Sequence, residues 1–211
     1  MAAFSSETAF RSLARERLLR APLGPVHALA GPSDFDLNPG TAAAVASALM
    51  PAAVLVPVLA GDDLTVLLTE RTGHLKAHAG QIAFPGGRIE PHDAGPLAAA
   101  LREAEEETGL PQTCVEPLGY LEPYRTGTGY LITPVVALVD RDFPLRPDPA
   151  EVESVFEVPL AFLMNEANHR IDARVWRGAE RRFYAIDYEQ RYIWGATAGI
   201  IRALYRRLFT A

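Results

Sequence analysis

Cysteine and basic residues are scarce in this sequence, and each shortage excludes a class of protein. The single cysteine, Cys114, leaves no partner for an internal disulfide and rules out a zinc site built from several cysteines. This usage is compatible with the reducing cytoplasm, where we expect the protein to act. Lys and Arg number 20 against 26 Asp and Glu, a formal charge of −6, whereas a general nucleic-acid binder normally carries the opposite balance. We therefore predict no nucleic-acid partner.

A long uninterrupted apolar segment is also lacking. Residues 42–60 are almost wholly apolar, but Pro51 and Pro57 interrupt them, and a membrane helix needs about 20 apolar residues that stay helical. We predict a short helix followed by a strand here, and no membrane partner. Residues 1–20 contain four arginines and no apolar run of seven residues, so they do not resemble an export signal.

The 211 residues, 49% of them apolar, suffice for one large domain or for one domain with an appendage. Periodicity and turn residues predict an amphipathic helix within 5–20, a hairpin of 54–59 with 64–68, a short strand at 81–84, a helix at 96–108, strands near 115–124 and 130–138, a strand or short helix at 153–164, a hairpin at 172–193 and a final helix near 195–209. Such interleaving indicates a mixed α/β sandwich. We expect residues 1–40 to form a helix and a linker, and residues 41–211 to form the main domain.

Three glutamates share one face of the predicted acidic helix. Pro96 suits the first turn of this helix, and Gly109 suits its C-terminal cap. Glu103, Glu106 and Glu107 are spaced three and four residues apart and therefore lie on one arc. An adjacent stripe is expected to pack inward, and it consists of Leu97, Leu101, Ala104 and Thr108.

Two interpretations of these carboxylates compete. A glutamate-rich run taken alone is typical of a solvated helix face. However, the three acids repel one another, and no lysine follows four residues later to neutralise them. Hard cations such as Mg²⁺ prefer oxygen ligands of this kind, together with substrate phosphates and water. The Gly86-Gly87 turn upstream and the order of residues within the helix favour the metal site.

The order of these residues resembles the Nudix hydrolases. The second half of the Nudix box is matched in full by Arg102-Glu-Ala-Glu-Glu-Glu-Thr-Gly-Leu110. The first half departs from the pattern, because Gly87 and five further residues lead to Asp93 rather than to a glutamate. Glu90 is a rival for the same role, so the first acid of the box is either Glu90 or Asp93.

The flanking segments are similar to the coenzyme A pyrophosphatase branch of that family. The similar segments are Leu67 to Gly87, Tyr124 to Tyr130, Ile132 to Pro134 and Ile193 to Gly199. The resemblance implies a Nudix-type α/β/α sandwich with a mixed sheet and an N-terminal helical extension. It also implies hydrolysis of the pyrophosphate of coenzyme A or its derivatives to 3′,5′-ADP and 4′-phosphopantetheine or the acyl form. The alternatives are a Nudix pyrophosphatase acting on ADP-ribose or dinucleotides, and an inactive nucleotide-binding sensor.

The resemblance assigns roles to individual residues. Mg²⁺ or Mn²⁺ is expected on Gly87, through its carbonyl, and on Glu103, Glu106 and Glu107. Glu103 either ligates the metal or orients the base, and Arg102 braces the loop. A later acid, Glu151 or Glu153, supplies a ligand or the base, and we take Glu153 as the catalytic candidate.

The remaining candidates are contacts to the substrate or to another chain. Phosphate or nucleotide contacts are predicted for Arg71, His78, Gln81 and Arg125, from the segments flanking the box. Core packing is the simpler role for the two tryptophans, Trp176 and Trp194, although both could stack on adenine. Arg202 and Arg206 are expected on an exposed helix face or at the rim of a homodimer.

Overall fold

The computed structural model describes residues 6–24, 31–39, 49–73, 80–176 and 178–210. Its main helices are α1 (Glu7–Arg17), α3 (Pro96–Thr108), α4 (Leu160–Leu163) and α5 (Ala196–Phe209). Its strands are β1 (Met50–Leu59), β2 (Thr65–Arg71), β3 (Ile82–Ala83), β4 (Gly86–Arg88), β5 (Val115–Tyr120), β6 (Tyr124–Arg125), β7 (Tyr130–Val139), β8 (Val152–Pro159), β9 (Arg170–Trp176), β10 (Ala179–Tyr188) and β11 (Arg191–Trp194).

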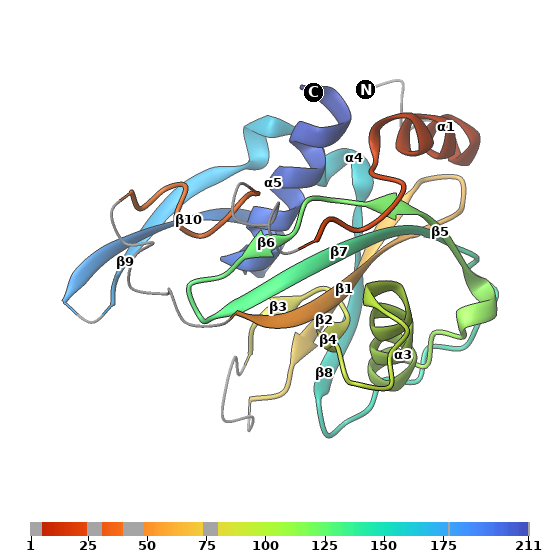
Figure 1. Cartoon of the computed structure of the whole chain (residues 1–211). Helices are drawn as coiled ribbons and strands as arrows, with labels where there is room; N and C mark the ends of the chain where they lie inside the picture. The colour runs from red at the N-terminus through yellow and green to blue at the C-terminus, as the bar shows by residue number, and fades with distance from the viewer. Residues whose placement is uncertain (1–5, 25–30, 40–48, 74–79, 177, 211) are drawn as a thin grey trace.

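A mixed sheet of eight strands forms the centre of the molecule (Figure 1). Strands β1 and β7 run parallel over their whole length, and the other pairings within this sheet are antiparallel. Strand β1 is central, and apolar clusters cover both of its faces. An apolar run such as residues 54–59 suits a strand buried on both faces. The predicted hairpin is confirmed, with Val58 opposite Val66.

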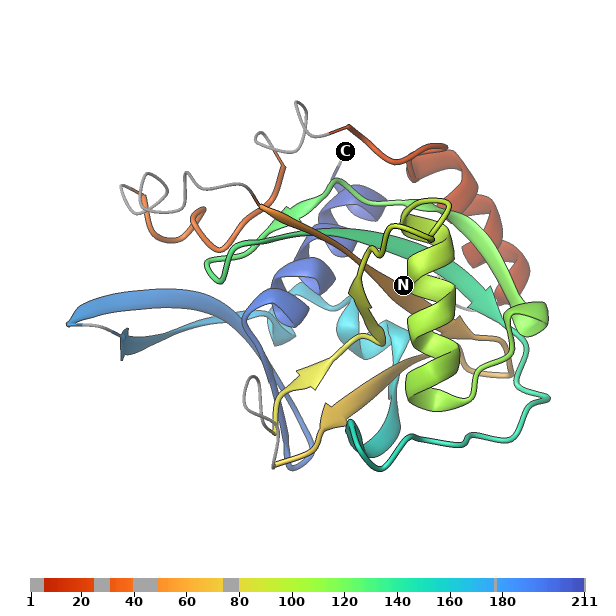
Figure 2. The ribbon, with the colours of Figure 1, turned by 60° about the horizontal axis from the view of Figure 1, so that its bottom comes forward.

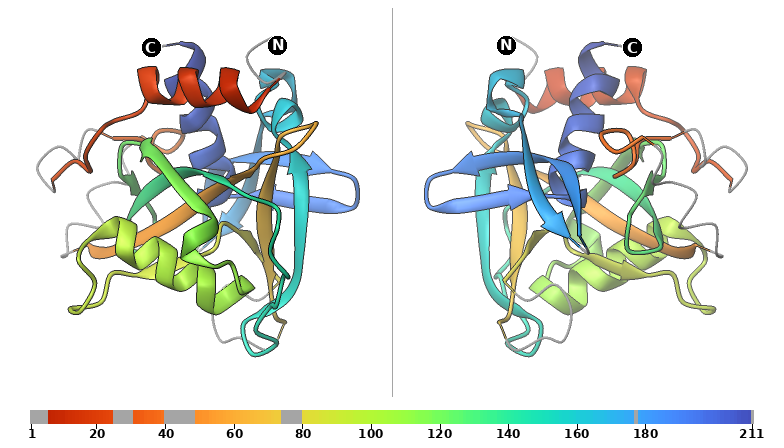
Figure 3. Two further views of the ribbon diagram at one scale, coloured as in Figure 1. Left: turned by 90° about the vertical axis from the view of Figure 1, so that its right-hand side faces the viewer. Right: turned by 90° about the vertical axis from the view of Figure 1, so that its left-hand side faces the viewer.

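Helices cover both faces of this sheet (Figure 3). On one face, Ala100 and Ala104 of α3 pack against Leu55 of β1. On the other face, Phe10 of α1 and Ile200 of α5 belong to a second apolar cluster. The two clusters make an α/β/α sandwich, so the predicted fold class is confirmed.

The N-terminal segment shares the core of the sandwich. Phe10 and Ala14 of α1 are fully buried, and the backbone of Leu19 pairs with that of Tyr120 next to β5. The predicted helix within 5–20 is thus present, while the division of the chain at residue 40 stays a prediction. The short helix predicted before β1 falls mostly on residues 40–48, outside the described residues. Among the described residues, we find no helix with the length and apolar character that a membrane crossing requires.

Two elements differ from the predictions in kind. The predicted hairpin near 172–193 is a three-stranded antiparallel sheet, in the order β11-β10-β9, which projects beyond the central sheet (Figure 2). Residues 86–88, read from the sequence as a turn, form strand β4 and pair with β1. A side chain at Gly86 would collide with the backbone of β1, so this pairing depends on glycine.

Candidate active site

Helix α3 carries the acidic face, and its bounds agree with the prediction. Gly109 ends the helix in a left-handed conformation with φ of 74° and donates its N–H to the carbonyl of Glu105. The predicted inward stripe is confirmed: Ala104 and Thr108 are buried, and the half-buried Leu97 and Leu101 pack against the same apolar cluster as Ala104. The prediction did not include Glu107, which also belongs to the buried face. One metal-ligand candidate therefore points into the protein.

The carboxylate of Glu107 is held between two donors. Oε2 accepts a hydrogen bond from the backbone N–H of Gly86 at 3.1 Å, and Oε1 accepts one from Arg71 at 3.3 Å. The side chain is only 5% exposed. Burial raises the pKa of Glu107 to about 7, and the nearby charges of Glu103 and Glu151 act in the same direction. Burial thus disfavours the ionised carboxylate despite its two donors.

Glu103 faces the backbone of strand β4. A side chain at Gly87 would collide with the carboxylate of Glu103, so this carboxylate lies directly against the glycine. Burial raises the pKa of Glu103, although Arg102 counteracts it. Glu106, one turn further along α3, is exposed and accepts a hydrogen bond from Arg102 at 3.0 Å. The structure therefore brings Gly87, Glu103 and Glu107 together and leaves Glu106 at the edge of the group.

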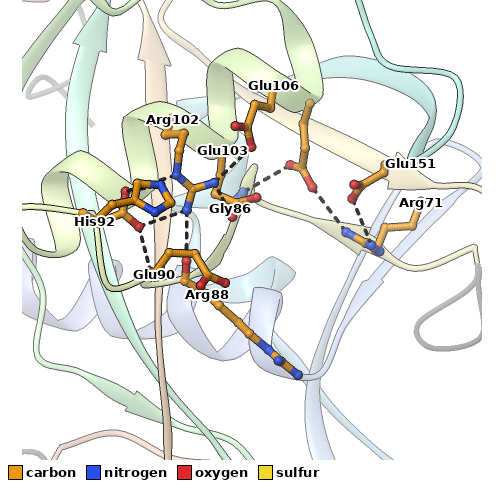
Figure 4. Close-up of polar contacts among 11 residues, drawn as sticks. Arg71, Gly86, Arg88, Glu90, His92, Arg102, Glu103, Glu106 and Glu151 are labelled. Atoms are coloured by element: carbon orange, nitrogen blue, oxygen red, sulfur yellow. Dashed lines mark hydrogen bonds and ion pairs between the residues drawn. The ribbon is translucent and has the colours of Figure 1, made fainter.

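Arg102 connects the helix to the preceding loop (Figure 4). Its Nε and Nη2 donate to the two carboxylate oxygens of Asp93 at 3.1 and 3.0 Å, and Nη2 also donates to the carbonyl of Arg88. These bonds, together with the N–H of Glu90, hold the pKa of Asp93 at about 2. Asp93 therefore occupies the bracing position, which the sequence left open between Glu90 and Asp93.

Gly87, Glu103 and Glu107 border a cleft of about 580 Å³. Its described lining includes five carboxylates, from Asp34, Glu90, Glu103, Glu107 and Glu151, but only two guanidinium groups, from Arg71 and Arg88. Nowhere in the described part of the chain do three acidic, histidine or cysteine side chains form a complete metal cage.

The donor set nevertheless fits a hard divalent cation. Mg²⁺ is usually bound through one or two carboxylates, with water and substrate phosphates completing its coordination. Glu103 and Glu107 are two such carboxylates, and burial raises the pKa of each, so ionising them together is unfavourable unless a cation lies beside them. A cation bound at this position would supply the missing positive charge.

The late acid at this cleft is Glu151. It lines the cleft, and its carboxylate lies 3.5 Å from Arg71. Glu153, our catalytic candidate, is exposed on β8 and does not appear among the described lining residues. The pairing of β8 with β2 has a register shift that leaves Glu153 as the extra residue between Val152 and Ser154. A bulge of this kind re-aims side chains and is invisible in the sequence.

The predicted substrate contacts separate into three groups. Arg71 and Gln81 line the cleft. His78 falls outside the described residues. Arg125 lies instead with its guanidinium over the ring of Phe35, at 4.9 Å from the ring centre. Trp194, for which core packing was expected, is half-buried and lines the cleft.

Arg202 is not on an exposed face, and that part of the prediction is wrong. Its side chain is only 16% exposed, because it pairs with Glu166 at 2.6 Å. Arg206 is exposed and contacts the hydroxyl of Tyr184. The homodimer stays a prediction.

Asp34 is a cleft residue that sequence reasoning missed. Its carboxylate accepts hydrogen bonds from the hydroxyl of Tyr124 at 2.8 Å and from the N–H of Gly127 at 2.7 Å. Burial is the main cause of its raised pKa. These partners lie about 90 residues away along the chain, and the segment around Asp34 carries no motif that signals the contact.

Carboxylates on one helix, braced by an arginine and facing a glycine strand in an α/β/α sandwich, define a hydrolase site of the Nudix class. The comparisons agree. Residues 49–177 match the family model described as the NUDIX domain. The chain is also 46% identical over 153 residues to a protein of Escherichia coli strain K12 named "Uncharacterized Nudix hydrolase NudL". The aligned region covers 72% of this chain and 80% of that protein. The chain belongs to the Nudix hydrolase family.

Solved structures of Nudix proteins are similar to this chain. A MutT/nudix family protein from Enterococcus faecalis has a TM-score of 0.46 and 21% identity, covering 75% of this chain and 61% of that one. The NUDIX domain of Shewanella oneidensis NrtR, solved with ADP ribose, has a TM-score of 0.42 and 22% identity, covering 66% of this chain and 85% of that one.

Proposed function

We propose that the protein hydrolyses the pyrophosphate linkage of coenzyme A or its derivatives, giving 3′,5′-ADP and 4′-phosphopantetheine or its acyl form. One observation carries the proposal. Arg71 and Gln81 belong to the segment 67–87, which is similar to the coenzyme A pyrophosphatase branch, and both line the same cleft as Glu103 and Glu107. The segment that suggests the substrate thus borders the carboxylates that suggest the reaction.

Nudix hydrolases generally use divalent metal ions, and we propose Mg²⁺ or Mn²⁺ here. Glu103, Glu107 and the carbonyl of Gly87 would hold the ion, and the resemblance adds Glu106 as a further ligand. When bound, the ion polarises a phosphoryl oxygen and lowers the pKa of a bound water.

The chain's own residues position the diphosphate and deprotonate the attacking water. Arg71 is fixed by Glu107 at 3.3 Å and by Glu151 at 3.5 Å, and its remaining N–H groups can donate to a diphosphate oxygen. Glu151 is 51% exposed at the cleft and can accept the proton of the attacking water. A water oxygen–phosphorus bond forms, the anhydride oxygen–phosphorus bond breaks, and two phosphate monoesters leave.

Glu151→Gln is expected to lower kcat by about 100-fold or more, because a positioned general base contributes at least that much. Glu153→Gln is the matched control and should change kcat by less than about twofold, since its side chain points to solvent. Metal-dependent turnover of both variants across pH measures the difference. If both variants retain full activity, the base lies elsewhere, and Glu103 is the next candidate.

The substrate is tested by a paired assay of coenzyme A and ADP-ribose, with Mg²⁺ and with chelator, in which products are identified by mass. We expect metal-dependent release of 4′-phosphopantetheine and a higher kcat/KM for coenzyme A. Faster cleavage of ADP-ribose would support the metal site on α3 and overturn the coenzyme A proposal. Nucleotide binding without product release, even in excess metal, would indicate a sensor.

We further propose the cytoplasm as the place of action.

A further inference from the structure

The projecting sheet presents an arginine against an aromatic cluster beside the cleft. The guanidinium carbon of Arg174 on β9 lies 4.8 Å from the ring centre of Trp194, 5.5 Å from that of Tyr192 and 5.9 Å from that of Phe183. The rings of Phe183 and Trp194 are themselves 5.1 Å apart. Trp194 lines the cleft, so Arg174 stacks on a residue of the cleft wall.

Among the residues that the structure describes, Arg174 has no carboxylate partner within ion-pair distance. Arg170, four residues earlier on the same face of β9, is bound by Asp187 at 2.7 Å and by Asp172 at 3.0 Å. In contrast, within the described ranges no carboxylate forms an ion pair with Arg174. Arg181 lies directly opposite it on β10, and the charge of Arg181 acts on the carboxylate of Asp34. A guanidinium that stacks on aromatic rings keeps its N–H edges available for an anion.

The two ends of the cleft therefore differ in charge. The end at α3 carries Glu103 and Glu107, with Glu151 from the residue before β8, and Arg71 pairs with the last two. There a phosphate needs a metal ion beside it. The end at Trp194 is aromatic, and Arg174 stacks on the ring of Trp194. A ligand with a diphosphate at one end and a further phosphate near a purine at the other end would match both.

We propose that Arg174, stacked on Trp194, binds a phosphate monoester on the ribose of the nucleotide, which in coenzyme A is the 3′-phosphate. This inference rests on the proposed function for its choice of substrate. Its chemistry is a charge-assisted hydrogen bond from the planar guanidinium to phosphate oxygens. This contact would make Arg174 a specificity residue that favours coenzyme A over nucleotides without the extra phosphate.

The test compares coenzyme A with 3′-dephospho-coenzyme A, using wild type and Arg174→Ala at saturating Mg²⁺. We expect Arg174→Ala to raise KM for coenzyme A by about tenfold or more, because hydrogen bonds to charged groups are strong, with kcat little changed. The KM for the dephospho form should stay at the wild-type value. An equal rise for both substrates, or no rise for either, overturns the assignment.

Arg182→Ala is the matched control. Arg182 lies opposite Ala173, on the other face of the same strand pair, and its substitution removes one positive charge as well. It should leave the KM of both substrates unchanged. A rise equal to that of Arg174→Ala would show a general effect of charge rather than a subsite.

A binding measurement separates failure of the subsite from failure of the proposed function. By calorimetry in Mg²⁺, wild type should bind 3′,5′-ADP about tenfold more tightly than 5′-AMP, and Arg174→Ala should bind the two equally. This preference can hold even if coenzyme A is not cleaved, in which case only the proposed function falls. Equal binding of the two nucleotides by wild type overturns the subsite, whichever substrate is cleaved.

Discussion

Glu107→Gln is expected to lower metal-dependent kcat by about 1,000-fold, since a catalytic metal ion supplies several kcal/mol of transition-state stabilisation. Glutamine has the shape of glutamate, so its carbonyl oxygen can still accept the N–H of Gly86, which is 3.1 Å away in the wild type. The substitution therefore removes the charge at the metal site and preserves the connection between α3 and β4. Turnover measured over a range of Mg²⁺ and Mn²⁺ concentrations gives the result.

Glu105→Gln is the matched control for this substitution. Glu105 lies on the same helix, but it is exposed and contacts Gln112 outside the cleft. Its replacement should leave kcat within about twofold of wild type. If Glu107→Gln retains full turnover in Mg²⁺, Glu107 is not a metal ligand.

Glu107→Gln should also change how the free energy of unfolding depends on pH in the metal-free protein. The pKa of Glu107 is about 7 in the folded protein against an ordinary value of 4.5, so the folded state holds its proton more tightly. The stabilisation is complete below pH 4.5 and is lost as the pH rises to about 7, in total about 3 kcal/mol. Thermal unfolding in chelator should therefore show wild type losing stability across this window and Glu107→Gln losing less. Mg²⁺ should restore wild type at pH 8, and equal pH profiles would contradict the assignment.

Arg102→Ala is expected to have the second largest effect, lowering kcat/KM by about 100-fold, because small displacements of catalytic groups have costs of that size. Arg102 binds both oxygens of Asp93, the carbonyl of Arg88 and the carboxylate of Glu103. Its loss releases the loop before α3 and leaves Asp93 with its side chain only 4% exposed and its main cationic partner gone. The melting temperature should fall as well.

Three further variants test the brace. Arg102→Lys keeps the charge but not the planar fork, so it should recover only part of the activity. Asp93→Asn should reduce activity and stability, and its effect should not add to that of Arg102→Ala, because the two residues form one unit. Glu90→Gln should be milder. A loss from Glu90→Gln as large as that from Asp93→Asn would move the bracing role to Glu90.

Several local features were readable from the sequence because short-range physics determines them. The spacing of glutamates at three and four residues and the cap at Gly109 define α3 with the bounds that the structure has. The apolar runs on either side of a Gly-Asp-Asp turn define the β1–β2 hairpin. The order of residues from Arg102 to Leu110 was sufficient to indicate the family that the comparisons show.

Tertiary structure alone decided which of these residues meet. The chain packs α3 on β1, and the burial of Glu107 raises the pKa of its carboxylate. A bulge in β8 separates the surroundings of Glu151 and Glu153, although the two residues are close neighbours in the sequence. Asp34 reaches its partners across about 90 residues of chain, and Arg174 reaches its partners on the two neighbouring strands of its sheet. Helical period and caps act over a few residues, whereas burial, register and charge at the cleft depend on segments that only folding brings together.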